Sequence, residues 1–175
     1  MVSASSAQAV LIDFETFTAP TTITAGTNIM GLTFDQNISV AAAFDLFPGS
    51  SGNQGIAPGF GGFSGFFSQT VASLSIAAGD SGGDIDTVTL VGYDALDQIV
   101  DSDSFTANIG QVLSIVGSGI ARFELQDVGT QIVFDNITFE FESDTIPEPA
   151  AIALFGLVLA GIGLARRRTG SSILT

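Results

Sequence analysis

The residues of this sequence that could do chemistry are carboxylates, and one short segment holds a dense group of them. The segment reads DSGGDID and contains Asp80, Asp84 and Asp86. Hard cations such as Ca²⁺ prefer oxygen ligands, so three carboxylates in one turn make a candidate Ca²⁺ site. The segment lacks the twelve-residue EF-hand pattern and its closing bidentate Glu. A solvated acidic turn is therefore the alternative.

A second acidic group joins the two ends of the predicted body. Asp13 and Glu15 lie near its start, and Asp135 and Glu140 lie near its end. The first and last strands are neighbours in many jelly rolls, which predicts that these carboxylates come together. No lysine is present to neutralise them. Ca²⁺ is again the candidate cofactor, and solvated acidic surface is the alternative.

Missing residue types exclude most other chemistry. The 175 residues include no His and no Cys, which excludes a Ser-His-Asp triad, a cysteine nucleophile, an ordinary zinc site and disulfides. The lack of lysine excludes Schiff-base chemistry and a P-loop. No carboxylate pair stands out as a glycosidase pair. With one tyrosine, Tyr93, and no Trp, little is available to stack on a sugar ring. We therefore predict a protein that is not an enzyme.

Charge is divided between the body and the end of the sequence. Residues 1–146 hold 17 acids and one base, Arg122, whereas Arg166, Arg167 and Arg168 are consecutive. A body this acidic repels phosphate backbones, which excludes nucleic acid as its partner.

An apolar stretch without charge precedes the three arginines. Residues 150–165 would make a helix about 24 Å long, slightly short of the ~30 Å hydrocarbon core, and flanking residues and local thinning can cover the difference. The arginines directly after the span mark its cytoplasmic side. We therefore predict a single C-terminal transmembrane helix with the acidic body across the membrane. A buried core helix is the alternative.

The first nine residues agree in part with export. Ala7 and Ala9 form the A-x-A arrangement of a secretory cleavage site, whereas the basic and apolar parts of a signal peptide are missing. We interpret residues 1–9 as the remnant of a signal peptide, with a flexible polar start as the alternative.

The body, residues 10–144, shows the pattern of strands. Apolar and polar residues alternate with period two in many short segments, such as 72–78, 121–126 and 136–142, which is typical of strands with one wet face. Nine or ten such segments, separated by Gly, Asp and Asn, predict an all-β fold, an antiparallel β-sandwich that resembles a jelly roll.

Residues 48–68 depart from this pattern. They contain seven glycines, which is too many for a strand, so we predict a long surface loop. Its phenylalanines would pack back onto the sandwich or, alternatively, be presented to a partner or a glycan. These residues are Phe60, Phe63, Phe66 and Phe67.

The last part of the sequence resembles a known sorting signal. Pro147, Glu148 and Pro149, then the apolar span, then the arginine cluster 166–168 follow one another in the order of the PEP-CTERM signal of Gram-negative bacteria, a tail also labelled an ice-binding-protein C-terminal domain. In that family a membrane protease-transpeptidase, exosortase, reads the tail and removes the span. The resemblance implies that residues 145–170 are the sorting signal, with Pro-Glu-Pro as its recognition motif and the arginines as its stop cluster.

The resemblance also implies partners and places. The precursor would sit in the inner membrane with a periplasmic body, and the processed product would reach the cell surface or the extracellular matrix. Such proteins are common in bacteria that make exopolysaccharide and biofilms. The body also resembles β-sandwiches found before this tail, which begin with an Ile-Asp-Phe-Glu strand and end with Phe-Asp-Asn-Ile-Thr-Phe.

Three functions are compatible with the sequence. The first is a non-enzymatic surface or matrix protein that exosortase sorts. The second is a Ca²⁺- or glycan-binding module, for example for extracellular polysaccharide, that the same tail delivers. The third is an inner-membrane protein that stays anchored.

Overall fold

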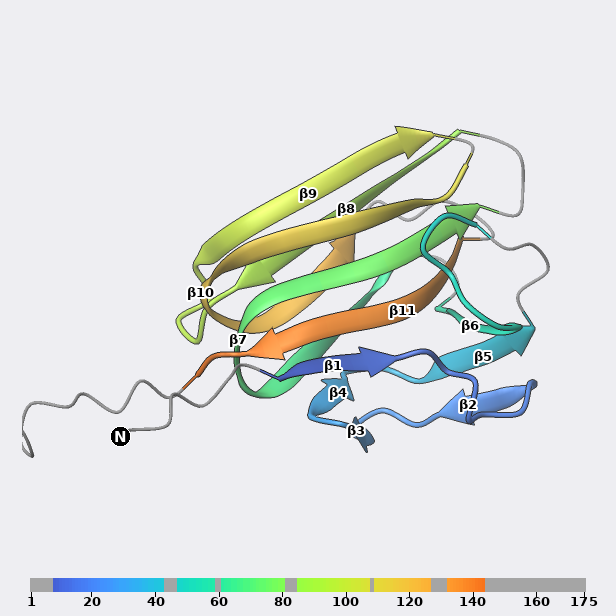
Figure 1. The fold of residues 1–175 in the computed structure, drawn as a ribbon, viewed down its shortest axis with the longest axis horizontal. Helices are drawn as coiled ribbons and strands as arrows, with labels where there is room; N and C mark the ends of the chain where they lie inside the picture. Colours follow the sequence, from blue (N-terminus) through green and yellow to red (C-terminus); the bar gives the residue numbers. More distant parts are fainter. Residues whose placement is uncertain are drawn as a thin grey trace, which may run out of the picture. The chain divides into compact units, whose positions relative to one another are not determined.

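The structure is all-β and antiparallel, as predicted. The computed structural model describes residues 8–42, 47–58, 61–80, 85–107, 109–126 and 132–143. Within these ranges there are eleven strands and no helix, and every strand pairing is antiparallel (Figure 1). The strands are β1 (Ala9–Ile12), β2 (Thr21–Ile23), β3 (Asn28–Ile29), β4 (Leu32–Phe34), β5 (Ile38–Ala42), β6 (Gln54–Ala57), β7 (Phe63–Asp80), β8 (Asp86–Tyr93), β9 (Ile99–Ala107), β10 (Gln111–Gln126) and β11 (Ile132–Phe141).

The strands form one hydrogen-bonded sheet that folds over on itself. Its order is β2-β5-β6-β11-β7-β10-β8-β9, with β1 on β11, and with β4 on β3 and β7. Strands β7 and β10 are long and bent, so they belong to both layers (Figure 1). In one layer residues 73–78 of β7 pair with 111–116 of β10, and in the other residues 63–66 pair with 122–125. This arrangement is consistent with the predicted sandwich.

Glu142 fixes the two bends together. Its carboxylate accepts hydrogen bonds from Thr70 Oγ1 at 2.6 Å, from Ser118 Oγ at 2.8 Å and from the Gly119 N–H at 2.8 Å. Gly119 has a φ of 82°, a conformation that glycine adopts without strain. The three donors hold the pKa of Glu142 below its usual value, because they stabilise the charged carboxylate.

Strand β9 lies against the first half of β10 through side chains. The Asp103 carboxylate accepts the Ser114 N–H at 2.8 Å, and the Asp101 carboxylate accepts the Val116 N–H at 2.9 Å. The backbone of β9 pairs with β8. Two aspartates thus occupy the backbone donors that β10 presents on this side.

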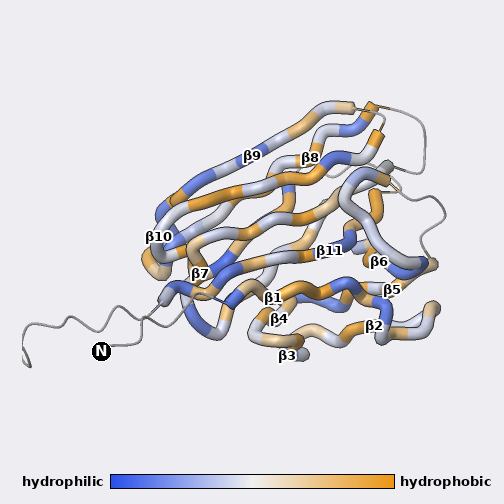
Figure 2. Tube along the Cα trace, viewed as in Figure 1, coloured by the Kyte–Doolittle hydropathy of each residue, from blue (hydrophilic) through white to orange (hydrophobic). Residues whose placement is uncertain are grey.

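Phenylalanine rings dominate the core. The Phe63 ring meets three others edge-on, at centroid distances of 5.7 Å to Phe34, 5.8 Å to Phe123 and 5.2 Å to Phe134. Edge-to-face contacts at such distances are favourable beyond the burial of area. Figure 2 shows hydrophobic and hydrophilic residues following one another along the strands, the pattern that points one set inward.

The prediction of one long loop over residues 48–68 was wrong. Residues 54–57 form β6, and β7 begins at Phe63. Phe63 and Phe67 pack inward, as predicted, whereas Phe66 is 48% exposed, and Phe60 lies outside the described residues. Gly65 is a packing requirement, because a Cβ there would come within 2.8 Å of both Leu32 and Phe123. Gly65 is thus required by close contact within a strand, whereas the glycines of this segment with positive φ lie between strands, at Gly49, Gly52, Gly61 and Gly62.

The described residues include the sandwich and not the predicted tail. Residues 6–143 form one compact unit. No helix within the described residues has the length and apolarity to cross a membrane. The predicted span 150–165, the sorting signal 145–170 and residues 1–7 lie outside the described ranges.

Candidate functional site

A polar face is built where β4, β7, β10 and β8 lie side by side. Burial of Phe123 and Leu125 turns the alternate residues Arg122, Glu124 and Gln126 outward. The strand register sets further outward residues beside them. Ser64 of β7 pairs with Glu124, and Phe66 of β7 and Tyr93 of β8 both pair with Arg122. The outward residues of β10 and those of β7 and β8 beside them therefore form one continuous outer surface of the sandwich.

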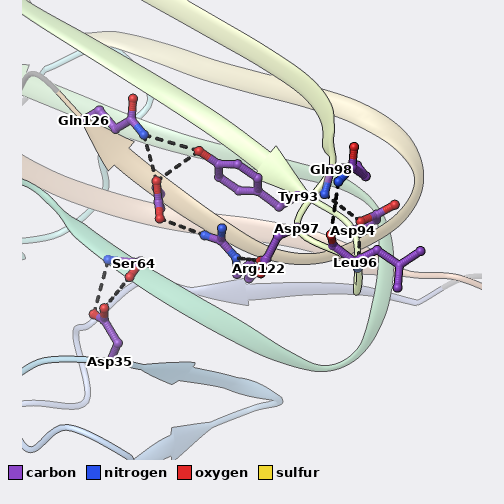
Figure 3. A network of polar contacts seen from close by, with 10 residues as sticks. Asp35, Ser64, Tyr93, Asp94, Leu96, Asp97, Gln98, Arg122 and Gln126 are labelled. Carbon is purple, nitrogen blue, oxygen red and sulfur yellow. Dashed lines mark hydrogen bonds and ion pairs between the residues drawn. The ribbon is translucent and has the colours of Figure 1, made fainter.

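A network of side chains organises this face around its only cation (Figure 3). Arg122 Nε binds Asp97 Oδ1 at 2.7 Å, and Nη1 binds Glu124 Oε1 at 2.8 Å. The guanidinium lies 3.8 Å from the centre of the Tyr93 ring, a cation–π contact. Glu124 Oε2 also accepts hydrogen bonds from Gln126 at 2.7 Å and from the Tyr93 hydroxyl at 3.0 Å. Two nitrogens of the guanidinium and one of its faces are thus engaged by neighbouring side chains.

These contacts set the protonation states of the network. The hydrogen bond from Gln126 and then the contact with Arg122 hold the pKa of Glu124 below its usual value, against the opposing effect of burial. Burial, and then the hydrogen bond to Glu124, raises the pKa of Tyr93. Glu124 is therefore a carboxylate and Tyr93 a neutral phenol at neutral pH.

An open cavity of about 230 Å³ lies next to this network. Its polar lining includes the side chains of Asp35, Gln36, Ser64, Glu124 and Gln126. The Asp35 carboxylate accepts a short hydrogen bond from Ser64 Oγ and a longer one from the Ser64 N–H at 3.4 Å (Figure 3). The cavity thus offers two carboxylates and two amide side chains to a ligand.

The ring of Phe66 completes the site. Phe66 is the next outward residue after Ser64 along β7, and its 48% exposure is high for a phenylalanine. An exposed ring beside fixed hydrogen-bonding groups suits a ligand with both apolar and hydroxylated faces.

The sequence analysis missed this site. The sequence does not indicate that Tyr93 and Arg122 are neighbours. The alternation at 121–126 predicts only that residues 122, 124 and 126 lie on the solvent-exposed side of a strand. That alternation was the available signal. The strand register that sets Ser64, Phe66 and Tyr93 beside it is a tertiary feature.

The carboxylates at the two ends of the body do lie on neighbouring strands. β1 pairs with β11, from Ala9 opposite Glu140 to Ile12 opposite Ile137. Asp13 and Glu15 follow β1 and lie close enough to Asp135 to raise its pKa by charge repulsion. Glu140 sits at the far end of the same pairing, beside Ala9.

These carboxylates hold a loop segment in the structure. Glu15 Oε1 accepts the N–H groups of Asn53 at 2.8 Å and Gln54 at 2.6 Å. Asp135 Oδ2 accepts the Ser51 N–H at 2.8 Å. No three acids within the described ranges are arranged as a ready metal site.

The other acidic group, in the DSGGDID turn, is described only in part. Asp80 ends β7 and Asp86 begins β8, whereas Asp84 lies outside the described residues. Asp86 is 8% exposed. A Ca²⁺ site at this turn stays a prediction.

Asp135 should make stability depend on pH. It is fully buried, and this burial, with repulsion from Glu15 and Asp13, raises its pKa from 3.8 to about 6 although the Ser51 and Asn136 N–H groups oppose the shift. Between these two values the folded state holds a proton that the unfolded state releases. The contribution of Asp135 to the free energy of unfolding therefore falls as the pH rises, by about 3 kcal/mol in all.

The measurement is denaturant unfolding at several pH values with wild type and Asp135→Asn. The difference in unfolding free energy between the two should change through this window, because the amide does not titrate. A constant difference would show that Asp135 has an ordinary pKa.

Comparison with known proteins assigns the tail. Residues 145–168 match the family model of the PEP-CTERM protein-sorting motif. No curated protein matches the sequence.

Solved structures give weaker likenesses. A family 29 carbohydrate-binding module is 14% identical, with 85% of this chain and 96% of that chain covered and a TM-score of 0.44. A family 6 carbohydrate-binding module is 14% identical, with 76% and 94% covered and a TM-score of 0.37. An α-L-arabinofuranosidase is 12% identical, with 67% and 25% covered and a TM-score of 0.43. Scores this low assign neither a fold family nor a ligand. What the comparisons do establish rests on residues 145–168, where the chain carries a PEP-CTERM protein-sorting motif.

Proposed function

We propose that this protein is exported, processed by exosortase and released to the cell surface or extracellular matrix, where its sandwich binds a polysaccharide. The sorting motif supports export and processing. The observation that carries the binding role is the open cavity of about 230 Å³ lined by Asp35, Ser64 and Glu124 beside the exposed Phe66. The precursor would be anchored in the inner membrane, with its body in the periplasm. A link to exopolysaccharide and biofilm is part of the same proposal.

The chemistry of the site matches a sugar chain. Carboxylates accept hydrogen bonds from sugar hydroxyls, amide side chains both donate and accept, and a phenylalanine ring packs against the C–H face of a pyranose. The sequence has no Trp to stack on a sugar ring, and the exposed ring of Phe66 supplies an apolar surface for this contact instead.

The same site is poorly suited to hydrolysis. A glycosidase needs one carboxylic acid with a raised pKa to protonate the leaving oxygen. Glu124 has a lowered pKa and is held by Arg122, Gln126 and Tyr93. This supports binding without catalysis.

Phe66→Ala should weaken polysaccharide binding by about tenfold, because a stacked ring contributes roughly 1–2 kcal/mol to such contacts. The measurement is affinity electrophoresis through gels that contain a soluble β-glucan, a mannan or a xylan. Leu11→Ala is the matched control, since Leu11 is 49% exposed and lies on β1, outside the site. Equal retardation of wild type and Phe66→Ala in every gel would contradict the proposal.

Ca²⁺ binding near Asp135 is a second candidate. The observation that favours it is a fully buried carboxylate whose neighbours Asp13 and Glu15 are also acidic. A divalent cation there would replace repulsion by attraction and raise the melting temperature. The same melting temperatures in Ca²⁺ and in EDTA would contradict it, both here and at the turn with Asp80, Asp84 and Asp86.

A further inference from the structure

We infer that the polysaccharide taken by this pocket is cationic, a chain that contains unacetylated amino sugars. This inference rests on the proposed function and specifies the chemical class of its ligand.

The charge around the pocket is strongly negative. The lining of the pocket includes the carboxylates of Asp35 and Glu124 and no basic side chain, and Arg122 next to it is paired with Glu124 and with Asp97. Arg122 is the only basic side chain in residues 1–146, against 17 acids. The pocket therefore attracts cations, and the whole body adds to this attraction at long range.

The contacts of Arg122 with protein carboxylates already offset its charge. Its guanidinium binds Asp97 and Glu124 at 2.7 and 2.8 Å, and its flat face covers the Tyr93 ring at 3.8 Å. Arg122 does not line the pocket, so a uronate, sulfate or phosphate group bound there would meet the carboxylates of Asp35 and Glu124. The pocket thus disfavours acidic exopolysaccharides, because it offers their anionic groups no unpaired cation and its carboxylates repel them.

The free acceptors suit an ammonium group. An ammonium donates up to three hydrogen bonds and accepts none. Asp35 is exposed, and its carboxylate is bound by Ser64 alone among the contacts described, so its oxygens retain room for further donors. Charge-assisted bonds from an ammonium are about twice as strong as those from a neutral hydroxyl or amide.

The exposed ring adds to the same preference. Phe66 pairs with Arg122 in the strand register, one outward position from Ser64. A cation over the face of a phenylalanine is attracted by the ring quadrupole. An amino sugar stacked on Phe66 with its ammonium toward Asp35 would use both groups at once.

The experiment compares three oligosaccharides of equal length by calorimetry with the folded protein. The probes are chitosan hexamer, which is cationic, its fully N-acetylated counterpart, which is neutral, and an alginate hexamer, which is anionic. The buffer is mildly acidic, so that the amino groups are protonated. We expect chitosan hexamer to bind about tenfold more tightly than the neutral hexamer, to weaken with added salt, and alginate not to bind.

Variants separate the pocket from the general charge of the body. Asp35→Asn and Glu124→Gln should each weaken the binding of chitosan hexamer about three- to tenfold more than they weaken the binding of the neutral hexamer, because each variant keeps a hydrogen-bonding group and loses only its charge. Glu140→Gln removes the same charge from β11, away from the pocket, and should have no effect. Melting temperatures confirm that each variant is folded.

The other outcomes are decisive. Equal binding of the neutral and cationic hexamers, abolished by Phe66→Ala, overturns the cationic inference and keeps the proposed polysaccharide site. If Glu140→Gln weakens the binding of chitosan hexamer as much as the pocket variants do, the hexamer is attracted to the whole acidic body, and the inference is also overturned. If none of the hexamers and none of the gel polysaccharides binds, both proposals fall.

Discussion

Replacement of Glu148 by alanine is expected to block processing and to leave the precursor intact. Glu148 is the charged residue of the Pro147-Glu148-Pro149 motif, and residues 145–168 match the sorting model as a unit. In the sequence analysis Pro-Glu-Pro is identified as the recognition motif, so loss of its one carboxylate is expected to prevent recognition by the protease. Intact mass spectrometry of each cell fraction gives the result: wild type should lose its apolar tail, and the variant should keep residues 150–168 and stay in the membrane fraction.

Ser171→Ala is the matched control for this experiment. It changes the tail just after the arginine cluster and outside the matched residues 145–168. It should be processed as the wild type is. A processed product from Glu148→Ala, or a full-length wild type in the outer fractions, would contradict the sorting role.

Phe63→Ala should produce a very large loss of stability, about 3–5 kcal/mol in the free energy of unfolding. Phe63 is 4% exposed and meets three rings, those of Phe34, Phe123 and Phe134. Truncation would leave a cavity where strands β4, β7, β10 and β11 converge. Urea unfolding followed by circular dichroism measures the effect.

Phe66→Ala provides the comparison on the same strand. This ring is half exposed, so its loss should change the unfolding free energy by less than about 1 kcal/mol. The two variants therefore separate the core from the binding face. If both variants unfolded at the same urea concentration, the inward and outward assignments along β7 would be wrong.

The period-two alternation predicted the fold class because it reports burial directly. Ala72–Ala78 and Ala121–Gln126 both lie in strands, and β1 does pair with β11. Alternation cannot report strand length when close packing demands glycine. Because of Gly65 and its neighbours, the sequence analysis did not predict the first residues of β7 as a strand.

The candidate site was less predictable for a different reason. Its groups come from β4, β7, β8 and β10, which are separated by up to about ninety residues of chain. Only the register brings Ser64, Phe66 and Tyr93 beside β10. The acidic ends of the body were predicted as neighbours, but their carboxylates accept the backbone N–H groups of Ser51, Asn53 and Gln54, a role that composition does not reveal.

Asp101 and Asp103 of β9 also affect how readily the sandwich pairs with other molecules. Exposed backbone donors on a strand are a template for pairing with another molecule, and natural sheets protect such edges with charge. Asp101 and Asp103 occupy the donors of Ser114 and Val116 and place negative charge along them. A copy of the same edge that approached these positions would find both donors occupied and would be repelled by the two carboxylates. The aspartates therefore protect this side of the sandwich against strand-to-strand aggregation.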